Sequence, residues 1–104
     1  MLKCETREDA LARLGRAMAD PTRCRILVAL LDGVAYPGQL AERLELSRSN
    51  VSNHLACLRG CGLVVASYEG RQVRYALSDP HLARALRELA QVVLAVDAAP
   101  ECED

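Results

Sequence analysis

Two cysteines spaced four residues apart, Cys57 and Cys61, are the residues whose type and spacing most clearly indicate chemistry. Residues four apart on a helix share one face, about 6 Å apart along the axis, so small rotamer changes would bring both sulfurs onto one metal ion. The same spacing disfavours a strain-free disulfide. A third cysteine, Cys102, lies in the acidic segment Ala98 to Asp104, where it has little reason to pack. The cysteines predict a soft-metal site, with burial as small hydrophobic side chains as the alternative.

The cysteine pair falls near the end of a helix expected within Leu46 to Leu63. Ser47 and Ser49 are candidate N-terminal caps, and Gly60 and Gly62 are candidate stops. At about 100° per residue, this helix has an apolar packing stripe, a small polar outward face and a flank that carries the cysteines. These faces are, in turn, Val51, Leu55 and Leu58; Ser49, Asn53 and Ala56; and Asn50, His54, Cys57 and Cys61.

Another short helix precedes this one and predicts a helix-turn-helix. Tyr36-Pro37-Gly38 opens it, and it is expected to end near Leu44, with Leu40 and Leu44 facing inward. Two short helices joined by a tight turn, the second richer in Ser, Asn and Arg, are typical of a DNA-reading motif. The polar start of the second helix supplies the candidate DNA contacts Arg48, Ser49, Asn50, Ser52 and Asn53.

The segment after the recognition helix changes to β-type spacing and predicts a hairpin. Leu63 to Tyr68 and Gln72 to Leu77 are short and β-rich, and Glu69-Gly70-Arg71 lies between them. A hairpin beside a helix-turn-helix forms a wing. Its arginines, Arg71 and Arg74, are expected to reach phosphate or the minor groove.

Helices are also expected at both ends of the chain, over Glu5 to Ala19, Pro21 to about Leu31, and Asp79-Pro80 to Val96. The last has a coiled-coil-type repeat: Leu82, Leu86, Leu89, Val93 and Val96. This repeat is either an internal core stripe or a dimer seam with the first helix. We expect a homodimer through the first and last helices, because two recognition helices then meet successive major-groove half-sites.

Composition bounds the protein to one small domain of 104 residues, with 1–4 and 98–104 expected as flexible ends. The fold class is mainly α with a β-hairpin wing. Only three aromatic residues, all tyrosines, argue against base stacking as the main binding mode. No apolar run is long enough for a membrane span, and no signal core is visible, so we expect a cytoplasmic protein. Five cysteines in a reducing compartment favour free thiols or metal ligands.

Charge is distributed unevenly along the chain. The net charge is −1, but Pro21 to Leu77 carries seven arginines and four acids, a net charge of +3. A basic middle can supply phosphate contacts while the acidic ends stay away from DNA. No Cys-x-x-Cys motif and no nucleophile–base constellation is visible, so we do not expect an enzyme.

Three motifs together make the chain resemble the ArsR/SmtB family of metal-responsive winged-helix repressors over nearly its whole length. They are Ala19-Asp20-Pro21-Thr22-Arg23-x-Arg25-Ile26-Leu27; Leu46-Ser47-x-Ser49-x-Val51-Ser52-x-His54-Leu55-x-x-Leu58-Arg59-x-x-Gly62-Leu63-Val64; and Gly70-Arg71-x-Val73-x-Tyr75-x-Leu77. Within the family, Cys57, Cys61 and Cys102 look like the cadmium- and lead-sensing branch of mycobacteria and related actinobacteria.

The resemblance implies a homodimer that represses by binding operator DNA when metal-free and is released by Cd(II) or Pb(II). It also implies a site with two thiolates, Cys57 and Cys61, from the recognition helix and one, Cys102, from the tail of the other protomer. Three thiolates suit cadmium or lead better than zinc, which usually takes four ligands in a closed site. No organic cofactor is expected. An arsenic- or redox-responsive thiol switch on the same fold remains the alternative.

Two metal sites of other branches are expected to be absent. The third helix has no cysteine where those relatives carry a thiolate motif. Asp79-Pro80-His81 matches half of a zinc site, but Val92 and Ala95 occupy the other half.

The remaining titratable candidates are expected to have lesser roles. Cys4 is a candidate auxiliary metal ligand, and Cys24 is expected to fill the core. His54 is expected to pack or to contact phosphate, and His81 to lie on a solvated face.

Overall fold

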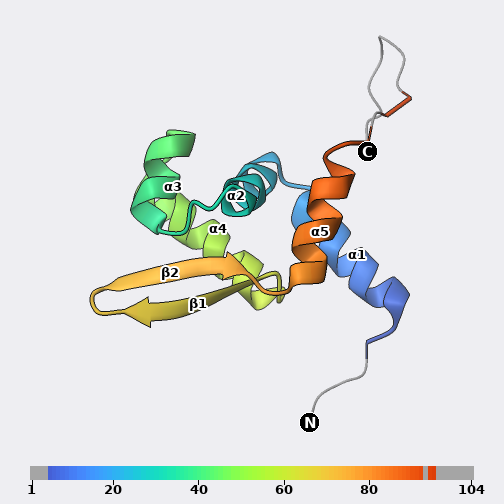
Figure 1. The fold of residues 1–104 in the computed structure, drawn as a ribbon, viewed down its shortest axis with the longest axis horizontal. Coiled ribbons are helices and arrows are strands. Elements are labelled where there is room, and N and C mark those ends of the chain that lie inside the picture. The colour runs from blue at the N-terminus through green and yellow to red at the C-terminus, as the bar shows by residue number, and fades with distance from the viewer. Residues whose placement is uncertain (1–4, 93, 96–104) are drawn as a thin grey trace.

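The computed structural model describes residues 5–92, 94 and 95. The expectation of flexible ends at 1–4 and 98–104 lies outside them. The elements in chain order are α1 (Arg7–Met18), α2 (Pro21–Leu31), α3 (Pro37–Leu44), α4 (Arg48–Gly60), β1 (Val64–Glu69), β2 (Gln72–Leu77) and α5 (Pro80–Leu89). The hairpin projects from one end of the molecule, and α1 and α5 lie toward the other (Figure 1). The predicted winged helix-turn-helix is confirmed.

The core is built around the apolar stripe of α4. Val51, Leu55 and Leu58 are completely buried, as are Ile26 of α2 and Leu40 of α3. The predicted packing face of the recognition helix is therefore confirmed. Burying each large aliphatic side chain contributes about 1.5–3 kcal/mol, so this stripe fixes α4 against α2, α3 and β1.

The ends of α4 follow local capping rules. The Ser47 hydroxyl accepts a hydrogen bond from the backbone N–H of Asn50 at 3.0 Å, so Ser47 is the N-cap and Ser49 lies inside the helix. Gly60 is the last helical residue, and the left-handed residue that stops the helix is Gly62, with φ +85°. The N–H of Leu63 bonds the carbonyl of Leu58 at 3.0 Å, which closes a Schellman motif.

The turn between α3 and α4 ends α3 with the same motif but without glycine. Glu45 has φ +59°, a left-handed conformation in which a Cβ is strained. The N–H of Leu46 bonds the carbonyl of Ala41 at 2.9 Å, and that of Glu45 bonds the carbonyl of Glu42. This turn sets the angle between the two helices of the motif.

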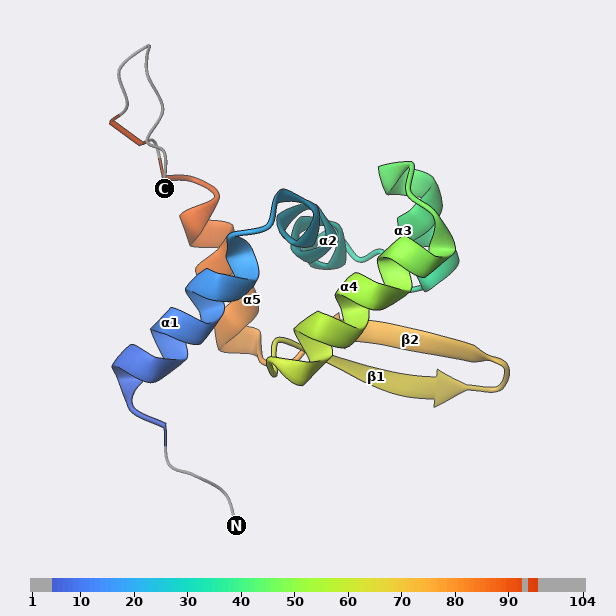
Figure 2. The ribbon, with the colours of Figure 1, turned by 180° about the vertical axis from the view of Figure 1, so that it is seen from behind.

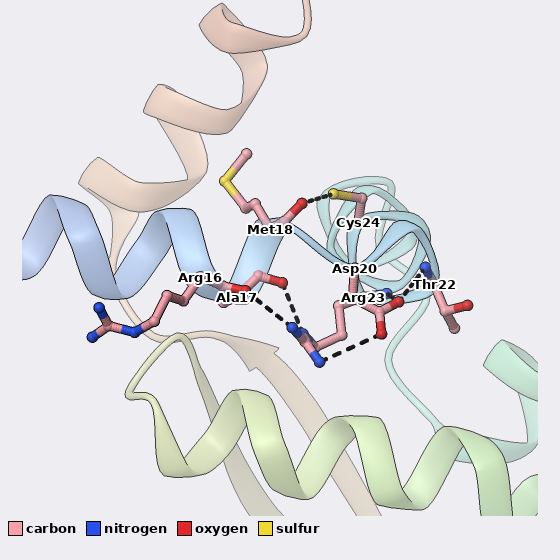
Figure 3. A network of polar contacts seen from close by, with 7 residues as sticks. All are labelled: Arg16, Ala17, Met18, Asp20, Thr22, Arg23 and Cys24. Carbon is pink, nitrogen blue, oxygen red and sulfur yellow. Dashed lines mark hydrogen bonds and ion pairs between the residues drawn. The ribbon is translucent and has the colours of Figure 1, made fainter. Parts of the chain in front are cut away.

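The junction of α1 and α2 is held by side chains of α2 (Figure 3). Asp20 caps α2 by accepting from the N–H groups of Thr22 and Arg23 at 2.8 and 3.4 Å. The hydrogen bond from Thr22 is the main reason that the pKa of Asp20 lies below its usual value. Arg23 also donates to the carbonyls of Ala17 and Arg16 at 2.8 and 3.0 Å, both in the last turn of α1.

Two further side chains of α2 satisfy carbonyls of neighbouring elements. Arg25 donates to the carbonyl of Leu44 at 2.9 Å and so caps α3. The half-buried thiol of Cys24 donates to the carbonyl of Met18 at 3.0 Å (Figure 3). Together with Arg23, these contacts give the Arg23-x-Arg25 motif a structural role as caps of α1 and α3.

The wing consists of β1 and β2, which pair antiparallel from Val64 opposite Leu77 to Glu69 opposite Gln72. Gly70, in the turn between them, has φ +62°. Leu63, which was expected to begin the first strand, precedes it because it completes the cap of α4.

The last helix was expected to reach Val96, and this prediction is wrong, because α5 ends at Leu89. Leu86 is buried and packs with α2, so the first part of the repeat is an internal core stripe. Ala90 is the C-cap of α5, and Val92 beyond it is exposed. Val93 and Val96 lie outside the described residues. None of the helices in the described part of the chain has the length and apolarity to cross a membrane.

Replacing Glu45 with glycine should stabilise the fold. Glycine adopts φ +59° without a Cβ penalty, so we expect the free energy of unfolding to rise by about 0.5–1 kcal/mol. Urea denaturation would measure it. The matched control is Glu42→Gly, inside the helix, which should lower the value by about 1 kcal/mol. An unchanged or lower stability for Glu45→Gly would contradict strain at the turn.

Asp20 should make the fold sensitive to acid. Its folded pKa lies below its unfolded value of about 3.9, so its contribution is present above that pH and is lost as the pH falls through the folded pKa. Asp20→Asn keeps the cap but not the charge. We expect the variant to be less stable near neutrality and the gap to close below about pH 4 in a pH series of urea denaturations. A gap independent of pH would refute this role.

Candidate DNA interface and metal centre

Seen from behind, α4 lies in front of the fold and above the wing (Figure 2), and the polar residues of its first turns are exposed. Its five predicted contact residues are all exposed, whereas Val51 between them is buried: Arg48, Ser49, Asn50, Ser52 and Asn53. The helix therefore presents donors and acceptors outward and apolar groups inward. A helix with this surface fits the major groove.

Arg48 does not simply extend into solvent from the first turn of α4. Its guanidinium lies against Gly38 of α3, where an added Cβ would be only 2.7 Å from Nη2. The absence of a side chain at position 38 therefore leaves the space that this guanidinium occupies. The sequence pattern identified Gly38 only as part of a helix start, and no local signal pointed to the contact.

A groove of about 560 Å³ separates the start of α3, the start of α4 and the wing tip. Arg48 and Ser52 line it from α4, and Arg71 lines it from the wing. The structure thus brings two of the predicted cationic contacts to one groove. Arg74 is exposed on β2 but does not line this groove.

The two thiols lie at the other end of the same helix. Cys57 is exposed, and Cys61 is half-buried at the C-cap of α4, where its N–H bonds the carbonyl of Cys57 at 3.0 Å. Neither forms a disulfide with another cysteine of the described residues. Two free thiols one helical turn apart are a suitable donor pair for a soft cation.

The described residues alone do not complete a metal site. Within 5–92, 94 and 95, no three His, Cys, Asp or Glu side chains gather closely enough to hold an ion. The other predicted ligands, Cys102 and Cys4, lie outside the described residues. The described residues of a single chain thus supply two neighbouring thiols and no third clustered ligand.

Charged groups of α1 and α2 face the flank of α4. The guanidinium of Arg13 in α1 donates a hydrogen bond to the Glu5 carboxylate at 2.7 Å. This bond is the main reason that the pKa of Arg13 is raised, and a negative charge on Cys61 would act in the same direction. His54 is half-buried, and its charge helps, as a lesser cause, to lower the pKa of Asp20. Although it shares a stripe with the cysteines, His54 joins no three-ligand cluster among the described residues.

Comparison with known proteins places this arrangement in a family. The model of the arsR family of bacterial regulatory proteins matches residues 20–65, which span the helix-turn-helix and enter the wing. The HTH-type transcriptional regulator CmtR of Mycobacterium tuberculosis is 81% identical over 102 residues, covering 98% of this chain and 86% of that protein. The chain belongs to the ArsR family. It is therefore a helix-turn-helix transcriptional regulator that binds DNA, and not an enzyme.

Two solved structures support the same assignment. The NMR structure of the cadmium metal-sensor CMTR from Mycobacterium tuberculosis superposes with a TM-score of 0.70 at 81% identity, covering 89% of this chain and 97% of that one. A homodimeric winged helix-turn-helix DNA-binding domain from Mycobacterium bovis, a possible ArsR-family regulator, gives a TM-score of 0.74 at 28% identity. It covers 86% of this chain and 87% of its own.

For an ArsR protein, the half zinc motif at the start of α5 has a structural explanation. The Asp79 carboxylate accepts from the N–H of His81 at 2.6 Å and caps α5. His81 is exposed, with Nδ1 at 2.9 Å from Nη2 of Arg84. The solvated position expected for His81 is confirmed.

Replacing Gly38 with alanine should weaken DNA binding without destabilising the fold. The new Cβ would displace the flexible guanidinium of Arg48, while alanine is the better helix former by about 1 kcal/mol. We expect a loss of affinity of about fivefold or more, close to that of Arg48→Ala. Fluorescence anisotropy would measure it, on a duplex that the wild type selects from a random library.

The matched control is Gly60→Ala, because an added Cβ at Gly60 meets nothing within 4 Å. That variant should bind the duplex like the wild type. Equal binding by Gly38→Ala and the wild type would show that the position of Arg48 is irrelevant to DNA affinity.

Proposed function

We propose that this ArsR protein is a cytoplasmic, homodimeric, metal-responsive repressor. It binds operator DNA when metal-free, and Cd(II) or Pb(II) bound to cysteine thiolates releases it. The observation that carries the proposal is the layout of α4, which bears the DNA-facing polar residues at its start and the free thiols Cys57 and Cys61 at its end. One rigid element thus carries both DNA-facing groups and candidate metal ligands.

The DNA contacts we propose lie on α4 and the wing. Asn50 and Asn53 offer the paired donor and acceptor that fit adenine, and Arg48 offers the fork that fits guanine or phosphate. Arg71 and Arg74 of the wing supply charge toward phosphate or the minor groove. Ser49 and Ser52 complete the set of exposed polar residues.

The metal ligands we propose are Cys57, Cys61 and Cys102, with Cys4 as an auxiliary ligand. The first two are free and accessible in the structure, and the similarity to a solved cadmium metal-sensor favours a soft metal. Arg13 places a positive charge near Cys61. Glu5, bonded to Arg13, directly follows Cys4 in the sequence, which supports the auxiliary assignment.

The dimer interface we propose involves α1 and α5. Leu11 of α1 is 66% exposed and Leu89 of α5 is 49% exposed. An apolar hollow of about 170 Å³ lies between α2 and α5 and is bordered by Met18 and Leu89. A second copy would cover these groups, as the homodimeric relative from Mycobacterium bovis suggests.

Coupling between the two ends of α4 follows from its cap. Cys61 is the C-cap residue, directly before Gly62 and Leu63, which close the helix onto the core. Tying its sulfur to a ligand on another segment would pull on this cap and tilt α4 relative to the wing. A near-complete switch needs about 5.5 kcal/mol of differential affinity, and operator DNA must weaken metal binding by the same amount.

A cadmium titration of the wild type and of Cys102→Ser would test the proposal. We expect thiolate-to-metal absorption for about three thiolates per Cd(II) in the wild type, with release of the selected duplex in parallel. Cys102→Ser should bind Cd(II) at least about tenfold more weakly and stay on DNA. Cys24→Ser is the control, because its thiol already donates within the fold, and it should respond like the wild type.

The outcomes separate the proposed ligands from the proposed function. If Cys102→Ser responds like the wild type, the ligand set is wrong. If no metal releases wild-type protein from DNA, metal response itself is wrong. If As(III) releases it at a concentration at which Cd(II) does not, the switch is the arsenic type. A wild type whose affinity for Cd(II) is the same with and without DNA would rule out the coupling.

A further inference from the structure

The wing is well anchored at its base. The N–H of Tyr75 donates to the carbonyl of Ala35 at 2.8 Å, which joins β2 to the segment before α3. Ser78, just after β2, donates from its hydroxyl to the carbonyl of Gly62 at 2.8 Å and from its N–H to that of Leu63 at 2.9 Å. A two-stranded hairpin is marginal by itself, so its outer part needs its own support to hold one position.

The outer part has one such contact. The Tyr36 hydroxyl donates to Oε1 of Glu69 at 2.7 Å. Within the described part of the chain, this is the only hydrogen bond between the tip residues 69–72 and the helices or the segments that join them. Tyr36 is also the N-cap of α3, two residues before the Gly38 against which Arg48 lies. The same short segment therefore supports both the wing tip and a cation of the recognition helix.

Charges at the tip make the contact more than a generic surface bond. Glu69 is the last residue of β1, next to the turn that carries Arg71. Its carboxylate would repel DNA phosphates if it turned toward them. The hydrogen bond to Glu69 is the main reason that the pKa of Tyr36 is raised, and the positive charge of Arg74 acts in the opposite direction. The phenol therefore lies close to both an acid and a base of the wing.

We propose that Tyr36 and Glu69 are positioning residues whose hydrogen bond fixes the wing tip relative to the recognition helix for DNA binding. The proposal rests on the DNA-binding part of the proposed function and is independent of metal response. Because the bond is exposed, its loss should barely affect the free energy of unfolding. Its loss should, however, leave the wing arginines without a fixed position relative to α4.

A double-mutant cycle on DNA affinity tests this role. The probe is the duplex selected by the wild type, and the proteins are the wild type, Tyr36→Phe, Glu69→Ala and the double variant. We expect Tyr36→Phe to weaken binding about threefold to tenfold in the wild-type background and less than about twofold in the Glu69→Ala background. An equal loss in both backgrounds would mean that the phenol contacts DNA directly, and no loss in either would also overturn the proposal.

The matched control is Tyr68→Phe, which removes a phenol of the same wing. Tyr68 is 74% exposed, and its hydroxyl has no hydrogen-bond partner among the described residues. This variant should bind DNA within about twofold of the wild type. A loss as large as that of Tyr36→Phe would refute the specific role of Tyr36. Urea denaturation should give all variants about the wild-type stability, and a clear loss for Tyr36→Phe alone would reduce the contact to a folding role.

An alkaline absorbance titration detects the bond without DNA. Glu69→Ala should lower the pKa of one of the three tyrosines toward its ordinary value, and Tyr36→Phe should remove that same titration. An unchanged titration in Glu69→Ala would show that the bond does not form in solution. DNA binding by the wild type and by the variants separates the DNA function from the positioning role. Failure of the wild type to bind any duplex refutes the DNA function. Normal binding by all variants refutes only the positioning role.

Discussion

Burial of the apolar stripe of α4 is the constraint on which the rest of the structure depends. Val51, Leu55 and Leu58 are completely enclosed by α2, α3 and β1, and truncating either leucine to alanine would cost about 2–5 kcal/mol. A helix held this firmly cannot rotate about its axis. Its polar start must therefore face outward beside the wing, and its thiol flank must face toward α1.

This rigidity makes α4 suitable for connecting two sites. The Ser47 cap lies at the end that carries the proposed DNA contacts, and the cap at Cys61, Gly62 and Leu63 lies at the thiol end, followed directly by the wing. A pull on the thiol end therefore acts on the helix and on the hairpin together. A DNA-binding protein of this fold must hold α4 and the wing in fixed relative positions. A metal bound at Cys57 and Cys61 would disturb both.

The arginines of the basic middle of the chain divide into structural and functional groups. Arg23 and Arg25 cap α1 and α3, and Arg43 pairs with Asp32 at 3.0 Å. These three cations are used within the fold, which the charge count by itself did not reveal. The basic surface that we propose for DNA contact is correspondingly smaller and depends more on the placement of Arg48 and the wing.

The sequence by itself determined whatever depends on residues close together in the chain. The helix faces, the Ser47 cap, the wing and the membership of the ArsR family all follow from local spacing and motifs, and the structure agrees with them. The helix predicted as far as Val96 ends at Leu89, because an apolar repeat shows which residues share a face and not where the helix stops. The metal site stays a prediction, because Cys102 lies outside the described residues.

Only the tertiary structure decided which distant groups meet. Tyr36 and Glu69 are 33 residues apart, Arg25 and Leu44 are 19 apart, and Arg48 reaches back to Gly38. No local pattern signals such contacts, because hydrogen bonds between side chains on different elements form only after the core has packed. Specific DNA recognition depends on this level of detail, because a cation or a wing tip must be placed to within an ångström or so of its partner.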